Sequence, residues 1–299
     1  LDIVIANEGR RDDVAPVRGR ITVLLNGGDG SFSKSEKIFL TTATEHPTDV
    51  EIGDINGDTI PDLLIVDTES TDPNVVRMIE LGIGNGAGTL SSSSFLDVGP
   101  FGIADIALAD IDEDGNLDIA MSLPSDSLGG GQNEVGVIFG DGAGGFMDLI
   151  RLEAGLTPFE VNIADINNDG NLDLVVGHLL DALRVYLGDG QGGFAASRRI
   201  IGIGASRIAV AFVDGDRNLD IVGKGPGAAL PQILYGDGQG NFPEREDFGF
   251  AATAAATDMD MADMDDDGRN DLVVVGSYVE IMGTDVVNFP GFVLLQIDN

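Results

Sequence analysis

The chain has 299 residues, of which 43% are hydrophobic, so it can bury a substantial core and is not expected to be disordered. Its 51 acidic and 16 basic residues give a formal net charge of −35, which excludes nucleic acid and anionic membrane surfaces as expected partners. It has no cysteine and therefore no disulfide framework, and no apolar run approaches the roughly 20 residues that span a bilayer.

Short apolar runs rich in β-branched residues recur along the whole chain. They include residues 1–5, 21–25, 63–66 and 137–139, and such runs are typical of β-strands. No stretch has a convincing amphipathic helical pattern, and the alanine-rich residues 251–256 are too few to form a helix. The pattern predicts an all-β protein.

The runs are separated first by an acidic turn of nine residues with Asp or Asn at positions one, three, five and nine. Good copies of this acidic turn occupy residues 54–62, 110–118, 165–173 and 263–271. A weaker copy at 212–220 has Phe212 at position one, and Arg217 at position six instead of glycine. Residues 1–5 match the end of the motif, so we expect a further copy to be cut by the chain start and something to precede Leu1.

The second kind of turn is rich in glycine and ends in Phe or Leu. These glycine turns occupy residues 26–32, 84–90, 140–146, 188–194 and 236–242. Their Asp-Gly and Asn-Gly pairs tolerate the positive φ angles that hairpin turns require. Each glycine turn therefore predicts a hairpin between two strands.

One acidic turn and one glycine turn make a unit of about fifty residues with four predicted strands. Four-stranded antiparallel units at this period are typical of β-propeller blades, and we favour a propeller over an array of β-sandwiches. Six units are visible, which fits a six-bladed ring or a seven-bladed ring without one blade. We expect residues 1–299 to form a single propeller domain of a longer chain, truncated in its first and last blades.

The acidic turns bring hard oxygen ligands together. Side chains at positions one, three, five and nine, with the carbonyl at position seven, supply the six or seven oxygens that Ca²⁺ prefers over Mg²⁺. The predicted ligands are Asp54, Asn56, Asp58, Ile60 and Asp62; Asp110, Asp112, Asp114, Asn116 and Asp118; Asp165, Asn167, Asp169, Asn171 and Asp173; and Asp263, Asp265, Asp267, Arg269 and Asp271.

A metal-free turn is the alternative for any single copy, because Asp and Asn are common turn residues. Repeated packing of several carboxylates into nine residues would be repulsive without a cation, which favours calcium. The first good copy is the least regular, since Thr59 replaces the glycine. In the copy at 212–220, the remaining Asp214, Asp216 and Asp220 predict a weak or empty site.

An EF-hand is excluded, although its loop begins similarly. It needs a bidentate Glu at position twelve, where this chain has Ile65, Met121, Val176 and Val274.

This layout resembles the FG-GAP/VCBS repeat family, which includes the propeller of integrin α subunits and many bacterial surface proteins. The resemblance covers nearly the whole chain, because the spacing, the glycine and the following strand all recur. It implies a calcium-binding propeller whose calcium loops join the first and second strands of each blade.

Nothing in the sequence indicates an enzyme. His46 and His178 are the only histidines and neither has metal-ligand spacing; we interpret His178 as a solvated or core-edge residue. The chain lacks a nucleophile-elbow motif and a P-loop lysine, while many of its carboxylates are committed to acidic turns.

The predicted loops between second and third strands differ in length. They are long at residues 7–19, 67–74, 123–134 and 277–290 and short at 178–182 and 224–230, which predicts a continuous binding rim for a protein or glycan. The absence of Trp disfavours sugar recognition relative to protein binding.

We therefore expect an extracellular or cell-surface binding and adhesion module, since loops of modest affinity fill at millimolar calcium. The alternative is a structural protomer of an extracellular assembly, or a non-catalytic domain of a larger secreted enzyme.

Overall fold

The computed structural model confirms an all-β chain. It describes residues 2–7, 19–28, 31–34, 47–67, 78–99, 102–125, 132–225, 231–247, 255–262, 271–282 and 285–295. Of these, residues 7, 34, 67, 78 and 201–204 and most of the last three ranges are described by their backbone alone. These ranges contain 22 strands in six antiparallel sheets, and they contain no helix that could span a bilayer. The chain divides into two compact units, residues 1–153 and 154–299.

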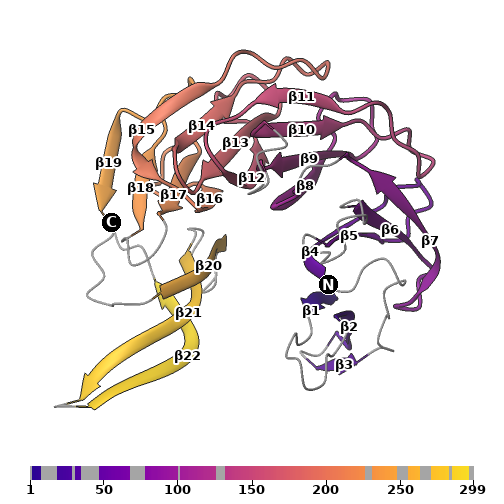
Figure 1. The fold of residues 1–299 in the computed structure, drawn as a ribbon, viewed down its shortest axis with the longest axis horizontal. Coiled ribbons are helices and arrows are strands. Elements are labelled where there is room, and N and C mark those ends of the chain that lie inside the picture. Colours follow the sequence, from indigo (N-terminus) through magenta and orange to yellow (C-terminus); the bar gives the residue numbers. More distant parts are fainter. Residues whose placement is uncertain are drawn as a thin grey trace. The chain divides into compact units, whose positions relative to one another are not determined.

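The first unit holds three sheets whose strands pair in chain order (Figure 1). They are β1 (Ile3–Asn7), β2 (Arg20–Asn26) and β3 (Phe32–Lys34); β4 (Pro47–Gly53), β5 (Asp62–Asp67), β6 (Met78–Gly84) and β7 (Leu90–Asp97); and β8 (Asp105–Ala109), β9 (Asp118–Leu123), β10 (Glu134–Ile138) and β11 (Ile150–Glu153).

The second unit repeats this arrangement. Its sheets are β12 (Pro158–Ala164), β13 (Asp173–His178), β14 (Ala182–Tyr186) and β15 (Arg198–Gly204); β16 (Arg207–Ala211), β17 (Asp220–Lys224), β18 (Gln232–Tyr235) and β19 (Glu244–Asp247); and β20 (Ala255–Ala262), β21 (Asp271–Met282) and β22 (Asp285–Leu295).

Burial follows the position of a strand in its sheet. Every residue of the second strands β9, β13 and β17 is buried, whereas the last strands β11 and β19 are mostly exposed. A second strand is covered on both faces, which explains its continuous apolar sequence. One core cluster joins neighbouring sheets of the first unit, with Leu64 and Ile79 packed in the same cluster as Ile106 and Met121.

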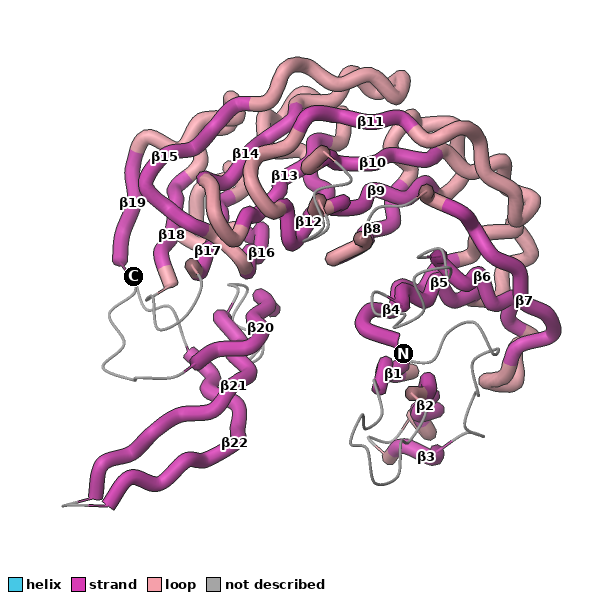
Figure 2. Tube along the Cα trace, viewed as in Figure 1, coloured by secondary structure: helices cyan, strands magenta, loops and turns pink. Residues whose placement is uncertain are grey.

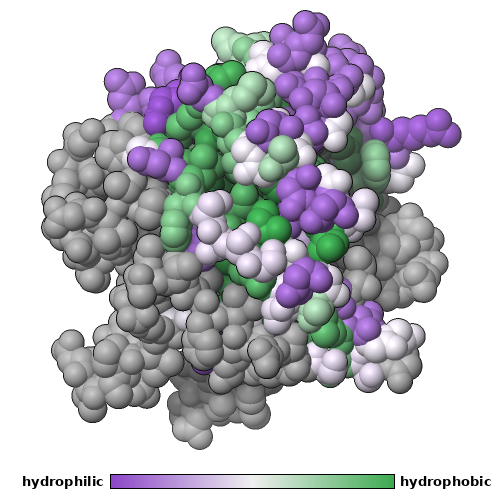
Figure 3. Space-filling view, turned by 90° about the vertical axis from the view of Figure 1, so that its right-hand side faces the viewer, coloured by the Kyte–Doolittle hydropathy of each residue, from purple (hydrophilic) through white to green (hydrophobic). Residues whose placement is uncertain are grey.

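Consecutive sheets of each unit meet through their first strands. In the first unit β1 contacts β4 and β4 contacts β8, and in the second unit β12 contacts β16 and β16 contacts β20. Figure 2 labels these first strands along the trace of the chain. In the view of Figure 3, hydrophilic residues cover much of the described surface and apolar residues show between them.

One predicted loop is wrong. Residues 277–290 were expected to be a long loop, but most of them extend the β21–β22 ladder, with Tyr278 opposite Phe289 and Met282 opposite Asp285. This stretch contains several Val and Ile residues, whose preference for strands favours an extended ladder over a loop. The predicted loops at 7–19, 67–74 and 224–230 lie largely outside the described residues, and so does the middle of the loop at 123–134.

Candidate metal centres

Each described acidic turn connects the first strand of a sheet to the second. Residues 54–62 join β4 to β5, 110–118 join β8 to β9, 165–173 join β12 to β13, and 212–220 join β16 to β17. All four therefore lie at the same end of their sheets, as the resemblance implied.

The ninth residue of each turn is a fully buried aspartate that holds two turns together. The Oδ2 atom of Asp118 accepts a hydrogen bond of 2.7 Å from the Ile111 amide, and its Oδ1 accepts one of 2.9 Å from the Gly140 amide of the glycine turn. Asp62, Asp173 and Asp220 make the same pair of bonds with the corresponding amides. This aspartate thus fixes the acidic turn to the glycine turn.

Burial also raises the pKa of three carboxyl groups, those of Asp118, Asp173 and Asp220. Desolvation raises the pKa of Asp173 to about 6, although the Gly188 and Ile166 amides oppose the shift. Desolvation raises the pKa of Asp118 and Asp220 as well. Neighbouring carboxylates add to each rise, through Asp112 for Asp118 and Asp214 for Asp220. A nearby cation would relieve this cost of keeping the carboxylates ionised.

The glycine that meets this aspartate has no room for a side chain. A Cβ atom on Gly140 would lie 2.3 Å from the Leu117 carbonyl oxygen, the eighth residue of the acidic turn. The equivalent distances are 2.1 Å at Gly84 and Gly188 and 2.2 Å at Gly236. The two turns therefore recur together because one packs directly on the other.

The first sheet preserves the same contact at the start of the chain. The Asn26 amide donates a hydrogen bond of 2.8 Å to Asp2 Oδ1, as the glycine amide does to the ninth aspartate in the complete copies. Asp2 thus has the geometry of a ninth residue, which supports the interpretation of residues 1–5 as the end of an acidic turn.

The aspartate at position one caps the turn from the other side. The Oδ2 atom of Asp110 accepts a hydrogen bond of 2.9 Å from the Gly115 amide, and Asp165 accepts an equal one from Gly170. Gly115 and Gly170 have φ angles of 91° and 92°, which explains the glycine at position six. Thr59 adopts φ 68° at the same position, so the irregular copy at 54–62 keeps this conformation.

The turn at 110–118 gathers three carboxylates. One oxygen from each of Asp110, Asp112 and Asp118 lies within 4.8 Å of the others. Asp110 Oδ1 is buried and has no hydrogen-bond partner. Since a buried carboxylate oxygen without a partner is costly, these hard oxygens fit a divalent cation such as Ca²⁺.

Two other turns have an asparagine at position three. The Oδ1 atoms of Asn56 and Asn167 each accept a hydrogen bond of 2.9 Å from the amide of the position-five aspartate, Asp58 or Asp169. Their first, fifth and ninth residues remain aspartates. Of the turn at 263–271, only Asp271, the first residue of β21, belongs to the described part of the chain.

The weak copy at 212–220 lacks its first ligand. Phe212 is 49% exposed, and the Arg217 side chain is exposed as well. The other bonds are retained, including those from the Val213 and Gly236 amides to Asp220. The turn therefore folds without an oxygen ligand at position one.

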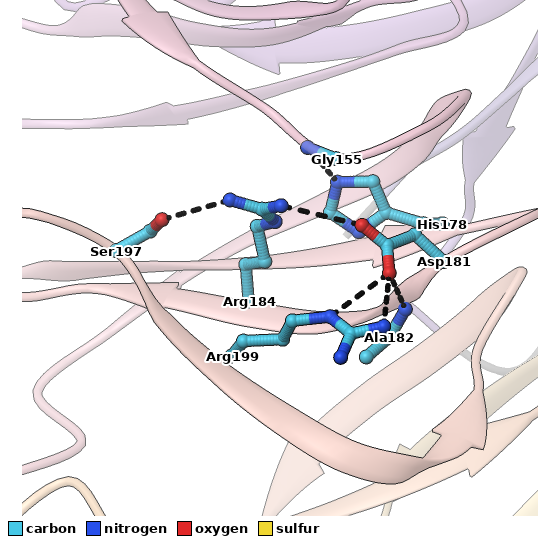
Figure 4. Close-up of polar contacts among 7 residues, drawn as sticks. All are labelled: Gly155, His178, Asp181, Ala182, Arg184, Ser197 and Arg199. Atoms are coloured by element: carbon cyan, nitrogen blue, oxygen red, sulfur yellow. Dashed lines mark hydrogen bonds and ion pairs between the residues drawn. The ribbon is translucent and has the colours of Figure 1, made fainter.

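A second polar cluster lies at the opposite end of β13 (Figure 4). His178, the last residue of β13, is fully buried and accepts a hydrogen bond of 3.0 Å on Nε2 from the Gly155 amide. Of its two expected interpretations, the solvated one is therefore wrong and the core-edge one agrees with the structure. Desolvation, assisted by the Arg184 charge, lowers the pKa of His178 to about 4, so the ring is neutral at physiological pH.

Asp181 is the centre of this cluster, and the sequence pattern did not predict a role for it. It forms ion pairs with Arg184 at 3.2 Å and Arg199 at 2.6 Å, and it accepts a hydrogen bond from the Ala182 amide. Although burial alone would raise the pKa of Asp181, these partners together hold it well below the usual range. Arg184 lies three residues from Asp181, but nothing local in the sequence points to Arg199.

A comparison with known families gives two matches. Residues 1–65 and 213–274 match the model of the FG-GAP-like repeat. These two segments are FG-GAP-like repeats. The first contains the acidic turn at 54–62 in full and the second contains the one at 263–271, so the repeat signal coincides with the motif that organises each sheet. No curated protein sequence matches the chain.

The solved structures that match the chain are distant in sequence. BBS1N in complex with ARL6DN matches with a TM-score of 0.50 and 10% identity over 88% of this chain and 72% of that one. The Tc holotoxin pore of Photorhabdus luminescens matches 96% of this chain with a TM-score of 0.42 and 15% sequence identity. The V. cholerae biofilm matrix protein Bap1 matches 77% of this chain with a TM-score of 0.43 and 18% sequence identity. The chain spans only 14% and 36% of these last two proteins.

Proposed function

We propose that the chain is a calcium-stabilised, non-catalytic binding and adhesion module of the extracellular space, built as a β-propeller. The observation that carries the proposal is the acidic turn at 110–118, where Asp110, Asp112 and Asp118 converge and Asp110 Oδ1 has no partner. Asp118, one of these three residues, also joins the acidic turn to the glycine turn, so a cation there would strengthen the connection that organises each sheet.

Calcium fits the donor set better than other biological cations. All candidate ligands at positions one, three, five and nine are carboxylate or amide oxygens, which suit hard cations with flexible coordination. The residues that would hold the ion are Asp110, Asp112, Asp114 and Asp118, with their counterparts in the turns at 54–62, 165–173 and 263–271. When bound, the ion would neutralise the carboxylates and restrain the turn, without taking part in a reaction.

The propeller is proposed from the packing within each unit. Consecutive four-stranded sheets meet through their first strands, which is how propeller blades surround an axis. Sheets whose strands pair in chain order also suit blades. A ring of six units would be tested by small-angle scattering of the purified chain.

The binding face is proposed at the end of the sheets opposite the acidic turns. Loops between second and third strands emerge there, and in the second unit the Asp181–Arg184–Arg199 cluster fixes one of them. A rigid scaffold that presents loops is the usual basis of recognition. A protein ligand is favoured over a glycan, since the chain has no Trp and three Tyr.

The decisive experiment is a glycan array incubated with the purified chain in millimolar calcium and, in parallel, in EDTA. Calcium-dependent binding would establish sugar recognition, and loop substitutions would then locate it. A blank array from protein that is folded by circular dichroism would exclude sugars among those printed and leave a protein ligand. Calcium titration of the same sample tests the metal separately, because an absence of calcium binding would contradict the proposed role of the acidic turns.

A further inference from the structure

The chain contains three Asn-Gly pairs, at residues 26–27, 56–57 and 85–86. The second pair lies inside an acidic turn, where Asn56 is the third residue and Gly57 follows it with a φ angle of 74°. Because glycine has no Cβ atom, the side chain of a preceding asparagine can approach the glycine nitrogen without steric hindrance. This approach is the first step of asparagine deamidation.

The contacts of Asn56 prepare its carboxamide for this reaction. The Asp58 amide donates a hydrogen bond of 2.9 Å to Asn56 Oδ1, and Asn56 Nδ2 donates one of 3.2 Å to Asp58 Oδ2. The first bond folds the carboxamide over the peptide group that joins Asn56 to Gly57. It also polarises the side-chain carbonyl, and it can stabilise the negative charge that develops on Oδ1 when a nucleophile attacks.

The Gly57 nitrogen differs from the nitrogen of Gly27, its counterpart in the first pair. Among the described contacts of the turn at 54–62, the Gly57 amide donates no hydrogen bond, whereas the Gly27 amide donates one of 2.8 Å to the Ser31 carbonyl oxygen. That bond must break before the Gly27 nitrogen can attack Asn26. The third pair, at 85–86, belongs to a glycine turn and to no predicted ligand set.

The product of the reaction at position 56 already occurs in another copy of the turn. Asp112 occupies the third position of the turn at 110–118, and its Oδ1 atom accepts a hydrogen bond of 3.3 Å from the Asp114 amide. This bond corresponds to the one that Asn56 accepts from Asp58. The fold therefore accommodates an aspartate at the third position, where Asp112 is one of three converging carboxylates.

We propose that the Asn56-Gly57 pair is a deamidation site, which converts the turn at 54–62 to the four-aspartate pattern of the turn at 110–118. The Gly57 nitrogen bonds to Asn56 Cγ, the Cγ–Nδ2 bond breaks, and ammonia leaves with the proton of the Gly57 amide. Water then adds to Cγ of the resulting succinimide and breaks the new Cγ–N bond. The Gly57 nitrogen regains a proton, and an aspartate remains at position 56.

The added carboxylate changes a candidate metal centre, and this consequence rests on the proposed function. Calcium affinity depends on the number of charged ligands, so the deamidated turn should bind the ion more tightly. Without a cation, the new charge at position 56 repels the Asp54 and Asp58 carboxylates of the same turn. Deamidation therefore makes this turn more dependent on a bound cation.

Peptide mapping by mass spectrometry tests the site, after incubation of the folded chain at mildly alkaline pH in metal-free buffer. Asn167 is the internal control, because it has the same turn position and the same 2.9 Å bond on Oδ1 but is followed by Asn168. Asn56 should deamidate at least about tenfold faster than Asn167, since Asn168 carries a Cβ atom. Equal rates, or an unmodified Asn56, would overturn the proposal.

The same map separates the folded turn from the Asn-Gly sequence itself. In the folded chain, with folding checked by circular dichroism, Asn56 should deamidate faster than Asn26. In urea the two rates should become similar, because the bond from the Gly27 amide to Ser31 is lost. An Asn56 that does not exceed Asn26 in the folded chain would contradict the role given to the turn.

Exchanging the following residues between the two turns provides a reciprocal test. Asn168→Gly should bring the rate at Asn167 to within about threefold of that at Asn56, and Gly57→Asn should suppress the reaction at Asn56. Gly57 and Asn168 have φ angles of 74° and 57°, and asparagine is among the residues that tolerate this region, so both variants should fold. Rates that the exchange leaves unchanged would overturn the proposal.

Asn56→Asp reproduces the product and tests the consequence for calcium. Titration calorimetry should show one site with an affinity at least about threefold higher than in the wild-type chain. The matched control Asn85→Asp adds the same charge outside the predicted ligand sets and should leave the affinity unchanged. Calcium binding that Asn56→Asp does not strengthen would overturn the proposed conversion, whereas a complete absence of calcium binding would contradict the proposed function and leave the modification itself to the peptide map.

Discussion

At the level of single residues, the buried aspartate that ends each acidic turn has the largest structural role. Asp118 accepts hydrogen bonds from amides seven and twenty-two residues away, so one side chain joins two turns of one sheet. The residue whose amide it contacts, Gly140, must be a glycine because there is no space for a Cβ atom. These two residues explain why an acidic turn and a glycine turn accompany each other in the four sheets where both are described.

Gly140→Ala should destabilise the protein by about 3 kcal/mol, because its Cβ would collide with backbone rather than with a flexible side chain. The Cβ position lies 2.3 Å from the Leu117 carbonyl oxygen. Urea denaturation would measure the loss. Asn26→Ala is the matched control, since position 26 already carries a side chain in the equivalent turn, and it should cost less than about 1 kcal/mol. Equal losses would contradict the steric argument.

Calcium affinity should fall as the pH drops below about 6, because Asp173 must be ionised to bind the ion. The affinity of that site should decrease by up to about tenfold per pH unit, with one proton displaced. Titration calorimetry at pH 7 and pH 5 would measure both the affinity and the proton release. An affinity that does not change with pH would contradict the raised pKa.

The raised pKa of Asp173 affects the stability of the metal-free protein in the opposite direction, so that stability falls as the pH rises. Since the pKa of Asp173 is raised above its ordinary value of 3.8 in the fold, the folded chain binds more protons than the unfolded chain between about pH 4 and 6. This group therefore makes the metal-free protein less stable as the pH rises through that window. Denaturation in EDTA at pH 4.5 and pH 7 would show the difference.

Among the strands, the position within a sheet determines composition. Second strands such as β13 are buried on both faces and are apolar throughout, apart from residues at their ends that make specific hydrogen bonds. The two ends of β13 have different roles. Asp173 at its start accepts a hydrogen bond from the Ile166 amide of the acidic turn, and His178 at its end accepts one from the Gly155 amide.

Asp181→Asn should loosen the loop between β13 and β14. The change leaves Arg184, whose side chain is only 18% exposed, without its counter-charge, and should cost about 2 kcal/mol. Arg199→Gln should cost less, because the Arg199 side chain is 51% exposed. Chemical denaturation of both variants would rank them, and the reverse order would show that Arg199 is the more important partner.

For the whole molecule, the repetition of one unit makes any stabilising ion act several times. Binding of a cation to the folded state adds about 2.7 kcal/mol per site when the free ion is at 100 times Kd. Four such sites would match the stability of an ordinary domain. The turn at 212–220, which lacks its first ligand, is not expected to contribute.

Chelation should therefore lower the melting temperature substantially, and differential scanning calorimetry with and without EDTA would measure it. Asp112→Asn should reduce the calcium-dependent part of the shift, because it removes one of three converging carboxylates. The matched variant Asp214→Asn alters the incomplete turn and should leave the shift unchanged. A melting temperature that is insensitive to EDTA would contradict structural calcium.

Much of the architecture follows from local sequence. The acidic turn depends on residues within nine positions, and the glycine turn depends on the φ angles that glycine permits, so both turns and the strands beside them were predictable. The order of the strands in each sheet also follows, because hairpins pair neighbouring strands.

Contacts between distant residues were not predictable in this way. The Gly140 amide reaches Asp118 and Arg199 reaches Asp181 only after the strands have paired. Likewise, β21 and β22 extend through the expected loop at 277–290 because residues 277–282 pair with residues 285–290 across the ladder, which depends on both strands together. Local preferences fix each turn, whereas burial and cross-strand pairing fix which side chains meet, because these depend on neighbours that are remote in the chain.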